Sequence, residues 1–278
     1  MAEEVAFKKR LEEDLRDAIS AGALHVAYQP QVLTKCESLI GVEALARWHH
    51  PQFGEISPVT FIKVAEDCGL IDELSDLVLD RACDEISALM SDLGRDIRLS
   101  VNISTKQFYE GCIAAKIAQA LQKWNFDPKL LEIEVTETVF IRNMEETRSL
   151  LHAIRDMGVR IALDDFGTGF SSLSYLRQFE VDRIKLDREF IKDICWSKYD
   201  EQVLLGILKL AQSLEIETIA EGVEDVQQRD ILERYGCDEI QGYFYSRPLS
   251  ISRFRQMIEL RWPRPDAVVG SQQTVSAA

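Results

Sequence analysis

The feature that most constrains the fold of this chain is its regular alternation of short β-rich runs with segments of helical periodicity. The β-rich runs are dominated by Val, Ile and Leu and lie at residues 24–32, 38–46, 97–104, 130–137, 159–166, 182–187, 217–222 and 238–243. Between them, apolar residues recur at helical spacing, as in Val203, Leu204, Ile207, Leu208 and Ala211. This pattern predicts an α/β fold with mostly parallel crossovers.

Eight strands in a chain of 278 residues fit a closed (β/α)8, or TIM, barrel better than an open sheet. The first two runs are joined by a short polar connection, which predicts a hairpin and therefore an antiparallel first strand. An open doubly wound sheet is the alternative, although no Gly-rich phosphate loop follows an early strand. We expect a helical region from about residue 58 to residue 90, and a later helix capped by Asn143 and Glu146 and ended by Gly158.

The same patterns set the expected domain limits. Residues 1–262 carry the strand and helix signals throughout, so we expect a single domain there. Residues 263–278 show little apolar periodicity, which predicts a disordered C-terminal tail.

Charge and composition narrow the functional classes. The formal net charge is -15, which argues against binding to duplex nucleic acid. No apolar run approaches the roughly 20 residues of a membrane helix, and the charged N-terminus lacks a signal-peptide core, so we expect a cytoplasmic protein. The six cysteines are scattered without zinc spacing, and the adjacent His49 and His50 are expected to lie in a loop.

Polar side chains follow nearly every predicted strand. They are Glu43, Asn102, Glu134, Glu137, Asp164, Asp165, Lys185, Glu221 and Gln241. One such residue alone is more often a helix cap, but in a barrel all of them would meet at the C-terminal face, where active sites lie. Crowded carboxylates repel one another, and a divalent cation removes that cost. Oxygen ligands of this kind favour Mg²⁺ or Mn²⁺.

These residues belong to short motifs whose order and spacing resemble the EAL-domain family. The motifs are YQPQV (28–32), EALARW (43–48), NIS (102–104), EVTE (134–137), DDFGTGFSSLSYL (164–176), IKLD (184–187), AEGVE (220–224) and QGYFYSRP (241–248). The resemblance spans roughly residues 8 to 260 and implies a modified barrel with an inverted first strand. It also implies hydrolysis of cyclic di-GMP to linear pGpG with Mg²⁺ or Mn²⁺, and inhibition by Ca²⁺.

The resemblance further implies roles for individual residues. The metal ligands would be Glu43, Asn102, Glu134, Asp164, Asp165 and Glu221. Lys185, Glu221 and Glu43 would be catalytic, with Lys185 contacting the attacking water and Glu221 acting as ligand or base. The substrate contacts would be Gln29, Glu43, Arg47, Asn102, Lys185, Asp187 and Gln241. The loop that couples metal binding to dimer contacts would include Glu137, Gly167, Thr168 and Gly169.

Four further expectations concern partners and alternatives. The resemblance implies a homodimer, and the natural protein could carry sensory or GGDEF domains. The first alternative function is a catalytically inactive cyclic di-GMP receptor, although no ligand of the motif set is missing. The second is an unrelated metal-dependent barrel enzyme such as an aldolase, which the order of the motifs disfavours.

Overall fold

A computed structural model describes residues 2–110, 112–167 and 179–263 of the chain. Its strands are β1 (His25–Leu33), β2 (Leu39–His50), β3 (Gly54–Ile56), β4 (Arg98–Ile103), β5 (Leu131–Thr136), β6 (Arg160–Phe166), β7 (Arg183–Leu186), β8 (Glu217–Ala220) and β9 (Glu239–Gln241). Its helices are α1 (Ala2–Ser20), α2 (Pro58–Cys68), α3 (Ile71–Leu93), α4 (Thr105–Glu110), α5 (Ile113–Trp124), α6 (Val139–Arg142), α7 (Met144–Asp156), α9 (Lys198–Ser213), α10 (Val226–Tyr235) and α11 (Ile251–Arg261). Two short 3-10 turns, η1 (Pro128–Leu130) and η2 (Arg188–Phe190), complete the described elements.

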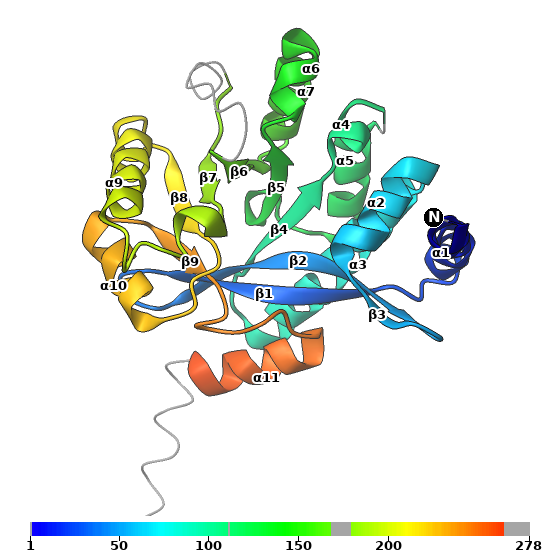
Figure 1. Ribbon diagram of the computed structural model, residues 1–278, viewed down its shortest axis with the longest axis horizontal. Coiled ribbons are helices and arrows are strands. Elements are labelled where there is room, and N and C mark those ends of the chain that lie inside the picture. Colours follow the sequence, from blue (N-terminus) through cyan, green and yellow to red (C-terminus); the bar gives the residue numbers. More distant parts are fainter. Residues whose placement is uncertain (1, 111, 168–178, 264–278) are drawn as a thin grey trace, which may run out of the picture.

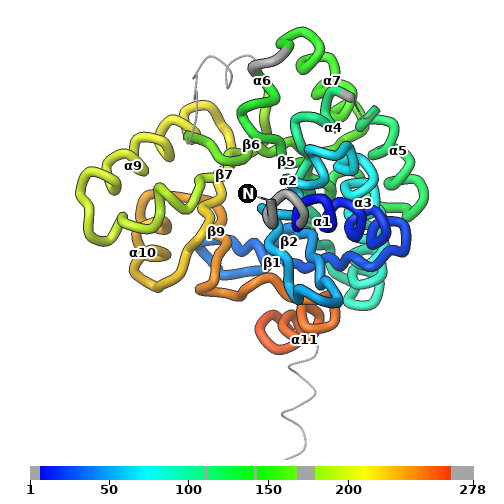
Figure 2. Tube along the Cα trace, turned by 45° about the vertical axis from the view of Figure 1, so that its right-hand side comes forward, coloured from blue at the N-terminus to red at the C-terminus, as the bar shows by residue number. Residues whose placement is uncertain are grey.

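The strands close into a barrel, as predicted, and not into an open sheet. Their order is β1-β9-β8-β7-β6-β5-β4-β2, and β1 also pairs with β2. Strand β1 is antiparallel to both of its neighbours, whereas the pairs from β2–β4 round to β8–β9 are parallel. Helices lie outside the strands, with α9 and α10 on one side and α3 and α5 on the other (Figures 1 and 2).

The alternation of side chains along each strand explains both the core and the site. On β5, Leu131, Ile133 and Val135 belong to the apolar core, while Glu132 and Glu134 alternate with them. Because successive side chains of a strand point to opposite faces, the glutamates face the barrel interior and the apolar residues face the helices. Strands β4 and β7 follow the same rule. The interior of this barrel is therefore unusually polar.

One local prediction is refined and another needs correction. The helical region predicted over residues 58–90 consists of two helices, because Gly69 adopts a left-handed conformation with φ 75° and ends α2. His49 and His50 do not lie in a loop but end β2, where they pair with β3. The short β3 hairpin was not predicted, because its three residues carry little apolar signal.

Other local predictions are confirmed. The Asn143 side chain accepts a hydrogen bond from Glu146 N and caps α7, and Gly158 follows the helix with φ 91°. Among the described helices, none combines the length and apolarity needed to cross a membrane. Residues 264–278 lie outside the described part of the chain, so the disordered tail remains a prediction.

Candidate active site

The site centres on the ammonium group of Lys185, at the mouth of the barrel where the parallel strands end. Lys185 lies on β7 and is 1% exposed. Its Nζ atom lies 2.5 Å from Glu134, 2.8 Å from Glu221, 3.2 Å from Asp164 and 3.6 Å from Glu43. These carboxylates come from β2, β5, β6 and the residue after β8. The barrel therefore brings the carboxylates of four predicted site residues together around one ammonium group.

Amide side chains orient Glu43 on the other side of this cluster. Asn102 Nδ2 donates a hydrogen bond of 2.7 Å to Glu43 Oε1, and Gln241 Nε2 donates to Glu43 Oε2. Gln241 Nε2 also lies 3.3 Å from Gln29 Oε1, and both glutamines are buried. This arrangement follows from strand register, since β1 pairs Gln29 with Glu43 and also pairs with β9.

The cluster holds more negative than positive charge, and its pKa values reflect that excess. Burial, followed by repulsion from Glu43, Asp164 and Glu221, raises the pKa of Glu134 well above its usual range despite the attraction of Lys185. Burial and the neighbouring carboxylates also raise the pKa of Glu221 to about 8. Burial alone would lower the pKa of Lys185, but its carboxylate partners outweigh burial and raise it.

The residues present fit a divalent cation. Glu134 Oε1 is buried and accepts no hydrogen bond within the described residues, so one oxygen of this carboxylate lacks a partner. The donors are carboxylate and amide oxygens, which suit Mg²⁺ or Mn²⁺. In the described part of the chain, no three His, Cys, Asp or Glu side chains are already arranged to hold an ion. The carboxylates are drawn onto the Lys185 ammonium group instead.

Asp164 and Asp165 lie just before the last residue of β6, where the strand becomes irregular. The β6–β7 register shifts between Leu163 and Phe166, and Asp165 adopts the left-handed region with φ 53°. Its backbone N–H donates to Asp164 Oδ1 at 3.0 Å. The irregularity exposes the Asp165 side chain while Asp164 faces Lys185. Burial, followed by repulsion from Asp164, raises the pKa of Asp165.

The predicted coupling loop is described only at its start. Gly167 N donates a hydrogen bond of 3.0 Å to Glu137 Oε1, so the glutamate after β5 is joined to the residue after β6. Gly167 has φ 93°, and a Cβ atom there would lie 2.5 Å from the Phe190 ring. Thr168 and Gly169 lie outside the described residues.

Asp187, a predicted substrate contact, also stabilises the local backbone. Its side chain accepts a hydrogen bond of 2.7 Å from Glu189 N and caps η2. Its predicted contact with substrate remains a prediction.

A mostly apolar hollow flanks the cluster on the side of α2 and α3. It has a volume of about 390 Å³ and is lined by Arg47, Asn102, Asp164 and Asp165 together with apolar residues such as Ile62 and Leu74. Arg47 donates to Ala46 O at 2.8 Å and has no ion-pair partner within the described chain. Its guanidinium group is therefore available to an anionic ligand.

A second hollow flanks the other side of the cluster. It has a volume of about 290 Å³, is lined by Gln29, Glu43, Glu221 and Gln241, and shares Leu45 with the first hollow. Its remaining wall contains Arg188, Glu224 and Tyr243, with Arg188 and Glu224 paired at 2.8 Å. Sequence reasoning missed these three residues, although each lies in or beside a motif that it recognised.

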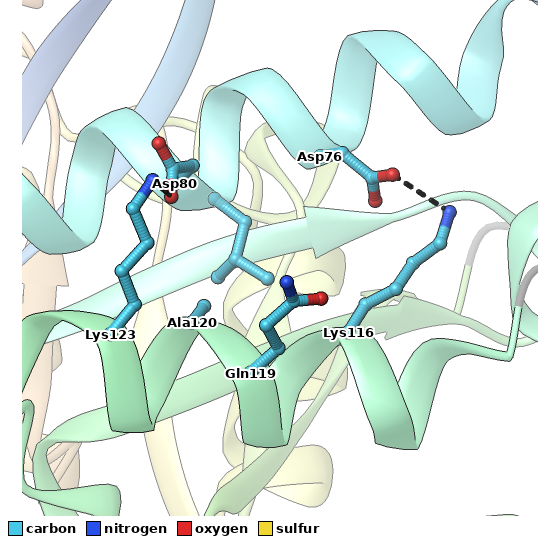
Figure 3. Close-up of a pocket in the computed structure, with 7 residues that line it drawn as sticks. Asp76, Asp80, Lys116, Gln119, Ala120 and Lys123 are labelled. Carbon is cyan, nitrogen blue, oxygen red and sulfur yellow. Dashed lines mark hydrogen bonds and ion pairs between the residues drawn. The ribbon is translucent and has the colours of Figure 1, made fainter.

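Another hollow lies outside the barrel, between α3 and α5 (Figure 3). Its volume is about 220 Å³, and it is bordered by the ion pairs Asp76–Lys116 and Asp80–Lys123. None of the predicted site residues lines it. Its charges are already paired with each other, so the barrel mouth remains the candidate active site.

Together, the inverted first strand and the acidic mouth define a narrow class of (β/α)8 barrel proteins, and comparison with known families agrees. The model of the EAL domain matches residues 12–248 of the sequence. The chain belongs to the EAL-domain family.

Two curated proteins illustrate the similarity. The chain is 39% identical over 244 residues to the signaling protein YkoW of Bacillus subtilis (strain 168), covering 88% of the chain and 30% of that protein. It is 37% identical over 249 residues to the cyclic di-GMP phosphodiesterase NbdA of Pseudomonas aeruginosa, covering 90% of the chain and 32% of that protein. The chain thus spans about a third of the length of these curated relatives.

Solved structures resemble the whole barrel. The PaMucR phosphodiesterase in its c-di-GMP complex is 37% identical with a TM-score of 0.84, covering 88% of this chain and 99% of that one. The EAL enzyme Bd1971, in a form bound to cAMP and cyclic-di-GMP, is 30% identical with a TM-score of 0.87, covering 92% of this chain and 70% of that one.

Proposed function

We propose that this chain is a phosphodiesterase that hydrolyses one phosphodiester bond of cyclic di-GMP to give linear pGpG in bacterial second-messenger signalling. The observation that carries the proposal is the convergence of Glu43, Glu134, Asp164 and Glu221 on Lys185 at the barrel mouth. The similarity to NbdA and to PaMucR supports the choice of substrate.

In this proposal, the reaction requires one or two Mg²⁺ or Mn²⁺ ions. The residues that would hold them are Glu43, Asn102, Glu134, Asp164, Asp165 and Glu221. When bound, such cations lower the pKa of water and neutralise charge that develops on the phosphate. Ca²⁺, which accepts more ligands in looser geometry, is expected to inhibit.

The protein's own groups position the substrate and move the proton. Arg47 offers a planar fork suited to a phosphate, and it lies in a hollow beside the cluster. Lys185 supplies a positive charge beside the attacked phosphate and the water. Glu221 lies 2.8 Å from Lys185, so its carboxylate is close enough to the attacked centre to accept a proton from the water. It serves as base or ligand.

The two hollows suit the shape of the substrate. Each adjoins the carboxylate cluster, and each contains one arginine, Arg47 in the first and Arg188 in the second. A cyclic dinucleotide has two bases and two phosphates, so it can place one base in each hollow with a phosphate over the cluster. Gln29 and Gln241 line the second hollow as substrate contacts.

A direct assay tests the proposal. Purified protein is incubated with cyclic di-GMP and Mn²⁺, and the products are separated by chromatography. We expect pGpG with Mn²⁺ or Mg²⁺, and no pGpG with a chelator or with Ca²⁺ alone. Lys185→Met is expected to lower kcat by about 10³-fold, because the group that faces the phosphate is lost. Lys123→Met, which removes an exposed lysine paired with Asp80, should leave kcat unchanged.

The same samples separate the alternatives. Tight binding of cyclic di-GMP, with the nucleotide recovered intact in the presence of Mn²⁺, would identify an inactive receptor and contradict the proposal. Turnover of a sugar phosphate without cleavage of a phosphodiester would point to an unrelated barrel enzyme. We also propose a cytoplasmic homodimer attached to sensory or GGDEF domains, which sedimentation of the full-length protein tests.

A further inference from the structure

A closed ring of ion pairs lies inside the barrel directly beneath the site. We call Arg98, Glu132, Arg183 and Glu239 the lower ring. Arg98 contacts Glu239 at 2.5 Å, and Glu239 contacts Arg183 at 2.9 Å. Arg183 contacts Glu132 at 3.1 Å, and Glu132 lies 3.7 Å from Arg98. The four side chains thus form a cycle of alternating charge.

The location of the lower ring is unusual for a barrel. All four residues are at most 5% exposed. The interior layers of (β/α)8 barrels are mostly bulky branched apolar side chains, and an apolar layer would avoid the desolvation of two guanidinium and two carboxylate groups. Buried ion pairs are weak sources of stability compared with apolar replacements of similar volume. Stability alone therefore does not account for the ring.

Three of the four contacts of the lower ring join strands that are not neighbours in the sheet. Glu132 is on β5 and Arg183 on β7, with β6 between them, and β8 separates Arg183 from Glu239 on β9. The Arg98–Glu239 contact joins β4 to β9 across the interior. These contacts restrain distances across the barrel. The backbone hydrogen bonds between adjacent strands do not restrain those distances.

Three of the four joined strands carry a site residue two positions beyond the ring residue. Glu132 precedes Glu134, Arg183 precedes Lys185, and Glu239 precedes Gln241 by two residues. Residues two apart on a strand lie on the same face, so the lower ring sits under the site residues. Ser100, two residues before Asn102, extends the ring by donating to Glu132 at 2.9 Å.

We propose that the lower ring is a positioning layer that sets the spacing of Glu134, Lys185 and Gln241 above it. Its effect on turnover rests on the proposed phosphodiesterase function, while its effect on cation binding does not require turnover. Ring residues contact neither substrate nor cation in this account. They act through the strands that carry the site residues.

A charge-balanced variant tests the proposal. In the double variant Glu132→Gln/Arg183→Met, Arg98 keeps Glu239 at 2.5 Å and Arg160 keeps Glu217 at 2.6 Å, so each remaining buried charge has a partner. We expect it to unfold at a urea concentration above that of either single variant. Because the spacing above is no longer fixed, kcat should fall by about 10- to 100-fold and the Kd for Mn²⁺ should rise by about 10-fold. KM for cyclic di-GMP should stay within about twofold.

Two further variants make the test decisive. Asp92→Asn/Arg255→Met removes a surface ion pair of 2.8 Å between α3 and α11 and should change neither kcat nor the Kd for Mn²⁺. Ser100→Ala removes one neutral hydrogen bond to the ring and keeps every charge, so it should fold and lower kcat by about threefold. Wild-type kcat and Mn²⁺ affinity in folded Ser100→Ala or in the folded double variant would overturn the proposal. If the wild type hydrolyses nothing, the proposed function fails, and Mn²⁺ affinity alone decides the role of the ring.

Discussion

At the scale of single residues, the excess of negative charge around Lys185 governs the behaviour of the site. One ammonium group faces four carboxylates, and Glu134 retains a buried oxygen without a hydrogen bond in the described chain. Either bound protons or bound cations can reduce the repulsion between these carboxylates. Protons and cations should therefore compete for the carboxylates, and the pH of the solution decides which of them stabilises the fold.

The first prediction follows from the raised pKa of Glu221. In the unfolded chain a glutamate has a pKa of about 4.3, and in the folded, metal-free protein the pKa of Glu221 is about 8. Folding therefore takes up a proton between these values, and stability is lost as the pH rises through them. We expect the free energy of unfolding of the metal-free protein to fall by about 2 kcal/mol between pH 6 and pH 8.5.

Urea titrations at the two pH values, with and without Mg²⁺, measure this loss. Mg²⁺ should stabilise the protein more at pH 8.5 than at pH 6, because it binds ionised carboxylates. Glu221→Gln should reduce the pH dependence, whereas Glu259→Gln, at an exposed position on α11, should keep it. A metal-free wild type that gains stability over this range would contradict the account.

The site residues could be predicted because they follow predicted strands and belong to recognisable motifs. Glu43, Asn102, Glu134, Asp164, Lys185, Glu221 and Gln241 all lie at the barrel mouth. Contacts between distant parts of the chain could not be predicted in this way. Arg98 and Glu239 are 141 positions apart, and nothing local in either strand indicates that they meet. The lower ring was therefore missed.

At the scale of elements, the packing inside the barrel requires a glycine at one position of β2. Gly41 lies on β2, two residues before Glu43, at the level of the lower ring. A Cβ atom there would lie 2.8 Å from Gln31 Oε1 and 3.0 Å from the carbonyl oxygen of Arg98. Gln31 Oε1 in turn accepts a hydrogen bond of 3.0 Å from Arg98. The missing side chain makes room for the polar interior.

The second prediction compares this glycine with one that has free space. Gly41→Ala should destabilise the protein by about 1–3 kcal/mol, because the backbone of Arg98 cannot move aside as a flexible side chain would. Gly206→Ala, on α9 with no atom within 4 Å of the added Cβ, should stabilise it by about 0.5–1 kcal/mol. Thermal unfolding of the two variants measures both effects. Equal stabilities would refute the packing argument.

Element boundaries were harder to predict than the elements themselves. The eight predicted runs all correspond to barrel strands, but β8 ends at Ala220 and β9 at Gln241, before the predicted limits. At both places the chain leaves the sheet so that Glu221 and Tyr243 reach the second hollow. The site residues thus lie where the pattern of alternation stops, and alternation alone cannot fix such ends.

At the scale of the whole molecule, the outer face of β1 is covered by a helix outside the family match. The match ends at residue 248, whereas α11 begins at Ile251. Figure 1 shows α11 lying against β1. Phe254 is fully buried and its ring stacks on that of Tyr28 at 6.3 Å between centroids. The inverted strand β1 therefore uses α11 as its outer cover.

The third prediction concerns truncation of this helix. Ending the chain after Leu249 removes Phe254 and Ile258, which are both buried, and burying each contributes about 1.5–3 kcal/mol. Since β1 closes the barrel by pairing with β2 and β9, its exposure should weaken the whole fold, lowering the urea midpoint and the turnover of cyclic di-GMP together. Ending the chain after Pro263 instead tests the predicted disorder of the tail and should leave both unchanged. If the chain ending at Leu249 unfolds at the same urea concentration as the intact protein, α11 is an accessory to the barrel and not part of its core.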